Sequence, residues 1–374
     1  MPDRTIPLSL PDITEAEVEA VSKVLHSGRL SIGPELEAFE DGLAARAGRK
    51  YGVGVNSGTS GLHLCVRAMD LQAGDEVITT PFTFIATANC LLFEQVKPVF
   101  VDIDPESYNI DPGAIEAAIT DRTKAILPVE VFGNVAHFDT YERIAQDHGL
   151  KMIEDCCEAL GASLAGRPAG NFGDCGVFAF YPNKQITTGE GGLIVTDNQE
   201  VRDMCVSMRN QGRATSAWLS HARLGYNYRM SELNAAVGRV QMERLDEIIE
   251  KRRNVAQAYD RVLSGLKDFH LPPMVERRTA SWFVYVVRLS EEYNPHQRDQ
   301  IIARLTSQGI GCSNYFVPVH TQPFVMEMLG TKPGDFPVTE AVAGRTIALP
   351  FHANLSEDEV AQVAEALAEA VSQV

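Results

Sequence analysis

The sequence predicts an α/β domain with a mostly parallel central sheet, followed by a smaller α+β domain. Strand-like apolar segments alternate with helical segments from Tyr51 to Asp155, which is the order of elements in a parallel sheet. Past Thr196 this alternation ends. A chain of 374 residues is also long enough for two domains. We therefore expect a large domain over residues 1–249 and a small domain over residues 250–374.

The composition is that of a soluble globular enzyme, with 45% hydrophobic and 22% charged residues. A formal net charge of −17 argues against nucleic acid or an anionic membrane surface as the main partner. We find no secretory signal pattern and no apolar stretch of membrane-spanning length. Seven cysteines without Cys-x-x-Cys spacing predict reduced thiols in a cytoplasmic protein. The nine histidines lack metal-binding spacings, so we expect no metal site.

Two helices are predicted at the start of the chain. The first begins near Asp12 or Thr14, either of which can cap it, and runs to about His26. A loop over residues 27–34 leads into a second amphipathic helix over residues 35–47.

A strand that ends at Asn56 is followed by a polar turn and by a helix that begins near Thr59 or Ser60. The backbone N–H groups of such a helix start, with the hydroxyl groups of Ser57 and Thr59, predict an anion site suited to a phosphate. Ordinary helix capping is the alternative explanation. The glycine spacing here is not that of the dinucleotide-binding fingerprint.

Further strands and helices alternate up to Asp155. We expect strands over residues 76–80, 98–104, 125–129 and 150–155, and helices over residues 112–119 and 138–148. Ligands of such sheets bind at the carboxyl ends of strands, where both Asp155 and the turn at Ser57 lie. A helix cap is the alternative role of Asp155.

Lys184 lies on a short irregular connection between two predicted strands. An apolar run leads into a Tyr-Pro turn, and the glycines of residues 188–192 lead out into a strand that ends at Thr196. An amine among apolar residues is partly desolvated, loses its proton more readily and can condense with a carbonyl group. A surface lysine in a hairpin is the alternative.

The remaining elements are mostly helical. We expect helices over residues 197–209, 231–263, 297–308 and 356–374, a loop over residues 211–223 and a strand over residues 281–289. Ser356 and Glu359 form a capping box at the start of the last helix.

Lys184, the phosphate cradle and Asp155 together predict a pyridoxal 5'-phosphate site. The lysine can hold the aldehyde of this cofactor, and the turn can hold its phosphate. A carboxylate that pairs with the pyridine nitrogen keeps the nitrogen protonated, so that the ring can accept electrons. Because the three features point to one cofactor, the separate alternatives become improbable, namely helix capping by the turn at Ser57 and by Asp155 and a surface position of Lys184.

Six blocks of sequence carry a resemblance to a known family. They begin at Asn56 (Asn-Ser-Gly-Thr-Ser-Gly-Leu-His-Leu), Pro81 (Pro-Phe-Thr-Phe-Ile-Ala-Thr), Pro98 (Pro-Val-Phe-Val-Asp-Ile), Ile153 (Ile-Glu-Asp-Cys-Cys-Glu-Ala-Leu-Gly), Asn183 (Asn-Lys-Gln-Ile-Thr-Thr-Gly-Glu-Gly-Gly) and Gly225 (Gly-Tyr-Asn-Tyr-Arg-Met). With these blocks, nearly the whole chain resembles the DegT-type nucleotide-sugar aminotransferases, which are perosamine-synthase-like members of the fold-type I pyridoxal phosphate enzymes.

This resemblance implies roles for single residues. Lys184 would form the internal aldimine and move the proton, and Asp155 would bind the pyridine nitrogen. Glu158 would lie near the ring hydroxyl, and Phe84 would stack on the ring. The phosphate-binding turn would comprise Ser57, Gly58 and Thr59.

The resemblance also implies a homodimer with shared sites, because Asn227 matches a residue that contacts the phosphate from the neighbouring subunit. The family commonly has a serine as a phosphate ligand five residues before the lysine, whereas this chain has Ala179. Without a replacement, the lost hydroxyl bond would weaken cofactor binding by about 1.5–3 kcal/mol.

The implied reaction moves an amino group from L-glutamate to a nucleotide-linked keto sugar, a 4-keto-6-deoxyhexose by resemblance. Candidate substrate contacts are Arg229, Tyr315 and His320. Arg229 can pair with a diphosphate or be a solvated side chain. His320 can line the pocket or be a buried, hydrogen-bonded histidine.

Three other functions are possible for relatives of this fold. In the branch that dehydrates sugars, histidine replaces the aldimine lysine, so Lys184 argues against that function. A non-enzymatic regulatory role fits poorly with an intact Lys184 and Asp155 and with the absence of a basic DNA-binding segment. A carbohydrate-binding module would need no such lysine.

Overall fold

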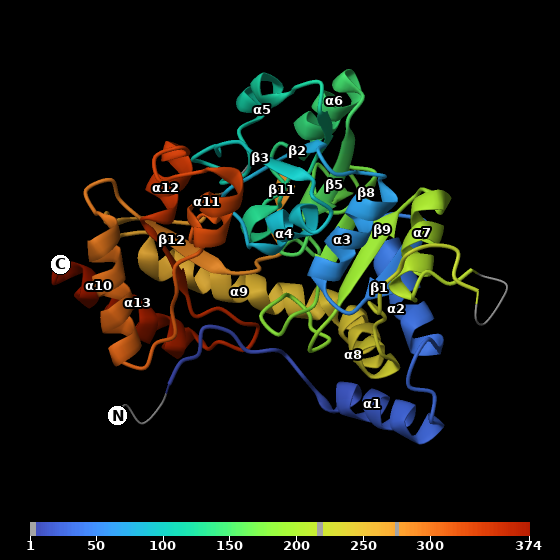
Figure 1. The fold of residues 1–374 in the computed structure, drawn as a ribbon. Helices are drawn as coiled ribbons and strands as arrows, with labels where there is room; N and C mark the ends of the chain where they lie inside the picture. Colours follow the sequence, from blue (N-terminus) through green and yellow to red (C-terminus); the bar gives the residue numbers. More distant parts are fainter. Residues whose placement is uncertain (1–4, 215–219, 274–276) are drawn as a thin grey trace.

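The computed structural model describes residues 5–214, 220–273 and 277–374. Its largest layer is a seven-stranded sheet that is surrounded by helices (Figure 1). In spatial order the strands are β1 (Tyr51–Val55), β9 (Gly192–Thr196), β8 (Cys175–Ala179), β5 (Lys151–Asp155), β4 (Thr123–Ile126), β2 (Glu76–Thr79) and β3 (Lys97–Phe100). Part of the predicted loop over residues 211–223 lies outside the described residues.

The sheet is mostly parallel, as predicted. Strands β5, β4, β2 and β3 pair in parallel, and β8 pairs in parallel with β5. Strand β9 runs antiparallel to both of its neighbours, β1 and β8. The central strands are buried along most of their length, which explains why they read as continuous apolar runs.

Helices connect these strands. They are α1 (Glu15–Ser27), α2 (Pro34–Arg46), α3 (Gly58–Ala68), α4 (Ala86–Leu92), α5 (Pro112–Ala118), α6 (Phe138–His148), α7 (Gln199–Arg209) and α8 (Glu232–Glu243). Thr14 caps α1 in a capping box with Glu17, so the prediction of this helix start is confirmed. None of the described helices is both long enough and apolar enough to cross a membrane.

The C-terminal part of the chain forms a second layer, which lies on the left in Figure 1. Its three-stranded antiparallel sheet has the order β10 (Phe269–His270), β12 (Tyr285–Leu289) and β13 (Thr346–Leu349). Its helices are α9 (Leu245–Leu263), α10 (Pro295–Ser307), α11 (Pro323–Leu329), α12 (Pro337–Ala343) and α13 (Glu357–Ser372). The predicted capping box of Ser356 and Glu359 is confirmed at the start of α13.

Short elements complete the fold. A small sheet comprises β11 (Arg278–Thr279), β6 (Ser163–Leu164) and β7 (Arg167–Pro168), and the two short 3₁₀ helices are η1 (Val131–Gly133) and η2 (Val319–Thr321).

Two clusters of buried apolar side chains meet along α9. Near the start of this helix, Ile248 and Ile249 pack in the cluster beside the main sheet. From Val255 onward, the helix packs in a second cluster with the small antiparallel sheet, and Ile6 from the N-terminal segment joins that cluster. We propose that the boundary between the large and the small domain lies within α9, close to residue 250.

The prediction of one helix over residues 231–263 is wrong, because α8 and α9 meet at Arg244. The backbone of Arg244 leaves helical geometry, with φ −98° and ψ 3°. Its guanidinium group binds the N-terminal segment, with Nη1 2.8 Å from Glu17 Oε1 and Nη2 3.3 Å from Asp12 Oδ2. Since the helical pattern continues on both sides of Arg244, periodicity alone does not reveal this break.

The strand predicted over residues 281–289 is shorter than expected, since β12 begins only at Tyr285. Trp282 has φ +54°, a left-handed backbone conformation that interrupts a strand. The carbonyl groups of Trp282 and Phe283 accept hydrogen bonds from Arg252. The start of the predicted strand is therefore a loop held by a side chain.

Two glutamates are buried side by side beneath the carboxyl end of β5. Glu130 and Glu154 are both 0% exposed, and their ligand atoms lie within 4.8 Å of each other and of Cys156 Sγ. Glu154 accepts hydrogen bonds from the backbone N–H groups of Phe172, at 2.6 Å, and Gly173, at 2.7 Å. Burial and the nearby charge of Glu154 raise the pKa of Glu130 well above its ordinary value. We interpret the pair as a protonated Glu130 beside Glu154.

We predict that Glu130→Gln makes stability less dependent on pH. Because its pKa is raised in the folded state, Glu130 keeps a proton that the unfolded chain releases above about pH 4.5. The free energy of unfolding should therefore fall as pH rises from about 4.5 towards the folded-state pKa, by up to about 1.4 kcal/mol per pH unit. Glutamine cannot ionise, so this contribution disappears in the variant.

Urea denaturation between about pH 5 and pH 8 measures these slopes. Glu116→Gln, at an exposed position of α5, is the control and should keep the slope of the unmodified protein. The same slope in Glu130→Gln and in the unmodified protein would contradict a protonated Glu130.

Candidate active site

A cavity of about 580 Å³ opens at the carboxyl ends of β1, β5 and β8. This is the edge at which α/β sheets bind ligands, and the volume lies in the range of small-molecule sites. Eight of the predicted site residues line it: Ser57, Gly58, Thr59, Phe84, Asp155, Glu158, Lys184 and Tyr315. Segments that are far apart in the sequence thus contribute to a single cavity.

Asp155 is the last residue of β5 and is 5% exposed. Its Oδ2 accepts a hydrogen bond of 2.8 Å from the hydroxyl group of Thr87, and its Oδ1 accepts one of 3.2 Å from the backbone N–H of Cys157. The residues after β5 form turns and not a helix. The alternative role of Asp155 as a helix cap is therefore excluded, and its carboxylate is held in place at the cavity wall.

Lys184 lies in the loop between β8 and β9, and its side chain is 13% exposed. Its Nζ is 3.7 Å from Glu158 Oε1 and 4.0 Å from the centre of the Phe283 ring. The loop joins two antiparallel strands, but the alternative of a surface lysine is wrong, because the side chain is largely buried. Burial raises the pKa of Glu158, although the charge of Lys184 and a hydrogen bond from the backbone of Phe132 act in the opposite direction.

Helix α3 begins at the cavity. Ser57 is its N-cap, and the hydroxyl group of Ser57 accepts a hydrogen bond of 3.1 Å from the backbone N–H of Ser60. The N–H groups of Gly58 and Thr59 lie in the first turn, where a helix offers them no acceptor. These two groups and the helix dipole create an anion site, whereas the Ser57 hydroxyl is committed to the cap.

The turn before α3 packs closely on the ends of β8 and β9. A Cβ atom on Gly58 would lie 2.8 Å from the Ala179 Cβ and 3.0 Å from the Cys157 Sγ. A Cβ atom on Gly192 would lie 2.5 Å from the carbonyl oxygen of Ser57. Glycine is required at both positions, because a Cβ would collide with side-chain atoms at Gly58 and with backbone atoms at Gly192.

These residues fit pyridoxal phosphate. The cavity offers an amine at Lys184, a buried carboxylate at Asp155 and an anion site at the start of α3. Phe84 is 62% exposed in the cavity wall, so its ring presents an open face for stacking. The methyl group of Ala179 leaves the phosphate without the hydroxyl donor that the family commonly has there.

Three of the predicted site residues do not line this cavity. Asn227 is exposed, and Arg229 Nη1 donates a hydrogen bond of 3.1 Å to Asn210 Oδ1. His320 is 0% exposed, and its Nε2 is 2.9 Å from Glu340 Oε1. The prediction of a substrate contact by His320 is corrected accordingly, because its ring is buried and hydrogen-bonded away from the cavity.

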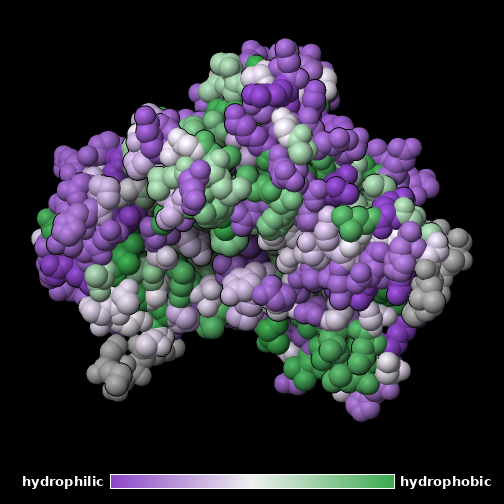
Figure 2. Space-filling model, viewed as in Figure 1, coloured by the Kyte–Doolittle hydropathy of each residue, from purple (hydrophilic) through white to green (hydrophobic). Residues whose placement is uncertain are grey.

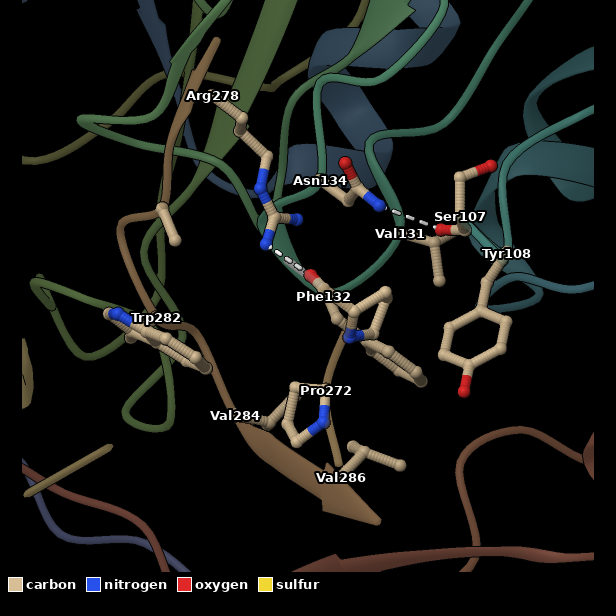
Figure 3. A pocket seen from close by; sticks show the side chains of 12 residues that line it. Ser107, Tyr108, Val131, Phe132, Asn134, Pro272, Arg278, Trp282, Val284 and Val286 are labelled. Atoms are coloured by element: carbon tan, nitrogen blue, oxygen red, sulfur yellow. Dashed lines mark hydrogen bonds between the residues drawn. The ribbon is translucent and has the colours of Figure 1, made fainter. Parts of the chain in front are cut away.

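The sequence analysis missed Thr87, which donates to Asp155, and Phe283, which contacts Lys184. A buried threonine in an otherwise apolar helix start was a usable signal for Thr87. Phe283 had no comparable signal, because a strand was predicted at a position that is a loop in the structure. A second space has a volume of about 20 Å³, which is room for about one water. Phe132 and Trp282 are among the side chains that line it (Figure 3).

Comparisons with known proteins identify the family of the chain. The family model described as the DegT/DnrJ/EryC1/StrS aminotransferase family matches residues 11–368. GDP-perosamine synthase from Caulobacter vibrioides is 38% identical over 339 residues, which cover 90% of each chain. EpsN from Bacillus subtilis, whose name describes a pyridoxal phosphate-dependent aminotransferase, is 33% identical over 372 residues, which cover 97% of this chain and 95% of EpsN.

A solved structure with the same fold is that of the Helicobacter pylori aminotransferase PseC, which is involved in the biosynthesis of pseudoaminic acid. It superposes with a TM-score of 0.95 at 28% sequence identity, over 99% of this chain and 100% of PseC. The fold is therefore that of the fold-type I enzymes, and the protein is a sugar aminotransferase that uses pyridoxal phosphate. The chain belongs to the DegT/DnrJ/EryC1/StrS aminotransferase family.

Proposed function

We propose that this enzyme transfers an amino group from L-glutamate to a nucleotide-linked keto sugar, specifically a 4-keto-6-deoxyhexose. The observation that carries the proposal is the meeting of Lys184, Asp155 and the start of α3 at one cavity. The name of the relative from Caulobacter vibrioides, GDP-perosamine synthase, supports a sugar linked to a nucleotide. The product would be an amino sugar for the biosynthesis of polysaccharides, glycans or antibiotics.

Pyridoxal phosphate, when bound, supplies an aldehyde that exchanges amino groups and a pyridine ring that accepts electrons. Asp155 orients the ring by pairing with its nitrogen, since the carboxylate is buried and fixed by Thr87 and the backbone of Cys157. The N–H groups of Gly58 and Thr59 bind the phosphate. Phe84 covers one face of the ring and excludes water from it.

Lys184 has two tasks in this proposal. Its Nζ would hold the cofactor between reactions, and the released amine would move a proton between the donor carbon and the cofactor. The ring of Phe283 and the carboxyl group of Glu158 confine this nitrogen to one side of the cavity. Glu158 lies near the ring hydroxyl in this arrangement and can hold a proton there, because burial raises its pKa.

The cavity mouth suits a sugar nucleotide. Besides Phe84, two apolar or aromatic side chains of the cavity wall are more than half exposed, Tyr181 and Val317, and these can pack on sugar and base faces. Between Asp203 and Glu232 the chain has no acidic residue but four arginines. We assign Arg229 from this basic stretch to the diphosphate, donated by a neighbouring subunit.

We also propose a homodimer with shared sites. Asn227 is exposed and does not line the cavity of its own chain. The segment that carries it is held firmly, because the rings of Tyr226 and Tyr228 stack with centroids 4.8 Å apart and their hydroxyl groups bond to Glu94 and His63. An exposed Asn227 on a firmly held segment can donate a hydrogen bond to a phosphate that is bound in the neighbouring subunit.

An apolar surface supports this dimer. Figure 2 shows apolar residues gathered at the lower right, where α1 lies in Figure 1. Val18 and Leu25 of α1 are each more than half exposed, and Leu10 and Ile13 are exposed in the segment that leads into this helix. A second copy of the chain would remove this surface from water, as obligate dimers do.

The proposed reaction predicts a change in the cofactor spectrum. Adding L-glutamate to the loaded enzyme should replace the aldehyde form by the amine form and release one equivalent of 2-oxoglutarate per site. A keto-sugar nucleotide should then restore the aldehyde form and gain the amino group, which mass spectrometry measures. The Lys184→Ala variant is the control. A spectrum that glutamate leaves unchanged would favour the dehydratase or the regulatory function instead.

We predict that Asp155→Asn lowers the rate of transamination by about 100-fold or more, because a neutral amide does not hold the ring nitrogen protonated. The fold should survive, since the amide oxygen can accept the hydrogen bond from the backbone of Cys157 while the NH2 group donates to the hydroxyl group of Thr87. Stopped-flow spectroscopy of the half-reaction with glutamate measures the rate, and circular dichroism checks the fold. Near-normal turnover would restrict Asp155 to a structural role.

A mixture of Lys184→Ala and Asn227→Asp chains should regain activity. Each variant alone is expected to be weak, the second because a carboxylate repels the phosphate. After random exchange, half of the dimers are mixed, and one site of each mixed dimer has both native residues. About one quarter of the normal activity should therefore return.

The matched control is a mixture of Lys184→Ala and Asp155→Asn, whose mixed dimers contain no intact site because both residues belong to the same cavity. Mass spectrometry of differently tagged chains verifies the exchange. Recovery in neither mixture after verified exchange would show that Asn227 acts within its own subunit or has no role.

A further inference from the structure

Arg252 is a deeply buried cation in the middle of α9. Its side chain is 2% exposed, and it ranks among the largest fully buried side chains of the described residues. Its hydrogen bonds all go to backbone carbonyl groups, and no ion pair involves it in the part of the chain that the structure describes. Burial lowers the pKa of Arg252 to about 10, so the group is still charged at neutral pH. A buried cation without a carboxylate partner is costly, and a specific task has to justify it.

The guanidinium group joins two segments that meet at the active site. Its Nη2 donates a hydrogen bond of 2.8 Å to the carbonyl oxygen of Lys184. Its Nη1 lies 3.2 Å from the carbonyl oxygens of both Trp282 and Phe283. The ring of Phe283 in turn lies 4.0 Å from Lys184 Nζ. One side chain therefore holds the main chain of the lysine and the residue that contacts its amine.

We propose that Arg252 is a positioning residue that sets the place of the Lys184 amine in the cavity. This inference rests on the proposed role of Lys184. The loop of Lys184 comes from the main sheet, whereas Phe283 precedes the small antiparallel sheet. Arg252 stands between the two apolar clusters that α9 connects, so it ties the two layers together beside the reacting nitrogen.

The chemistry of the guanidinium group explains why arginine is suited to this position. Its planar fork presents several N–H donors in fixed directions, and it therefore reaches carbonyl groups of separate segments at the same time. Lysine retains the charge but offers a single nitrogen, and glutamine offers one short amide group. An apolar side chain would fill the core but leave all three carbonyl groups without this donor.

The test separates placement of the lysine from general stability. Pyridoxal phosphate attaches covalently to an amine, and borohydride traps this bond for peptide mapping. Pyridoxamine phosphate has no aldehyde, so its binding needs the pocket but not a correctly placed lysine. The variants are Arg252→Gln and Arg252→Lys. The control is Arg253→Gln, because the side chain of the neighbouring Arg253 is 40% exposed and pairs with Glu250 on the same helix.

In the unmodified protein the trapped cofactor should map to Lys184. In Arg252→Gln the rate of trapping at Lys184 should fall by about tenfold or more, as expected for a misplaced reacting group. The dissociation constant of pyridoxamine phosphate should change by less than about threefold, a free energy below 0.7 kcal/mol. Arg253→Gln should change neither quantity. The rate of trapping should also fall in Arg252→Lys, because lysine keeps the charge but not the planar fork of N–H donors.

Unchanged trapping in both Arg252 variants would overturn the proposal. So would an equal loss of trapping and of pyridoxamine phosphate binding, since a purely structural residue affects both. If Arg252→Gln does not fold, as judged by circular dichroism, the same two measurements on Arg252→Lys test the proposal. If neither variant folds, Arg252 is structural and the proposal is wrong. A label on another lysine in the unmodified protein would instead refute the proposed role of Lys184.

Discussion

The close approach of the turn before α3 to the ends of β8 and β9 is the constraint on which the active site depends. Gly58 and Gly192 permit this approach, because a Cβ on Gly58 would collide with Ala179 and Cys157, and a Cβ on Gly192 would collide with the backbone of Ser57. This contact places the start of α3 beside the loop that carries Lys184. The parallel pairing of β5 with β8 then sets Asp155 opposite Val177. The groups that we propose to bind the phosphate, the ring nitrogen and the aldehyde are thus positioned by backbone geometry, which varies less than side-chain conformation.

The charges around the cavity are unevenly distributed within one chain. Asp155, Glu158 and Glu190 line it, and Lys184 is its single basic residue among the described lining residues. A phosphate and a nucleotide diphosphate would add further negative charge. The N–H groups at the start of α3 supply only part of the compensation, because the helix dipole acts within the first turn. Cationic and amide groups from outside the chain that forms the cavity would compensate this excess of negative charge.

The fold and the core of the site could be predicted from the sequence, because both depend on local patterns. The alternation of apolar strands with helices, the position of Asp155 at a strand end and that of Lys184 between two strands need no tertiary information. The break at Arg244 and the loop at Trp282 could not be predicted, since each is created by a guanidinium group that binds residues far away in the sequence. The sequence left two roles open for His320, and only the structure decides for the buried, hydrogen-bonded one, because a periodic pattern does not reveal the bond to Glu340.

Ala179 connects the missing hydroxyl donor with the proposed dimer. Its methyl group faces Gly58 at the phosphate turn, so the chain itself offers the phosphate mainly backbone N–H groups. Under the proposed arrangement, the partner subunit's Asn227 supplies the remaining side-chain contact. A ligand that binds across an interface stabilises the assembled state, and the assembled state binds the ligand more tightly, by thermodynamic linkage. Loss of the serine therefore makes retention of the cofactor and association of the subunits depend more strongly on each other.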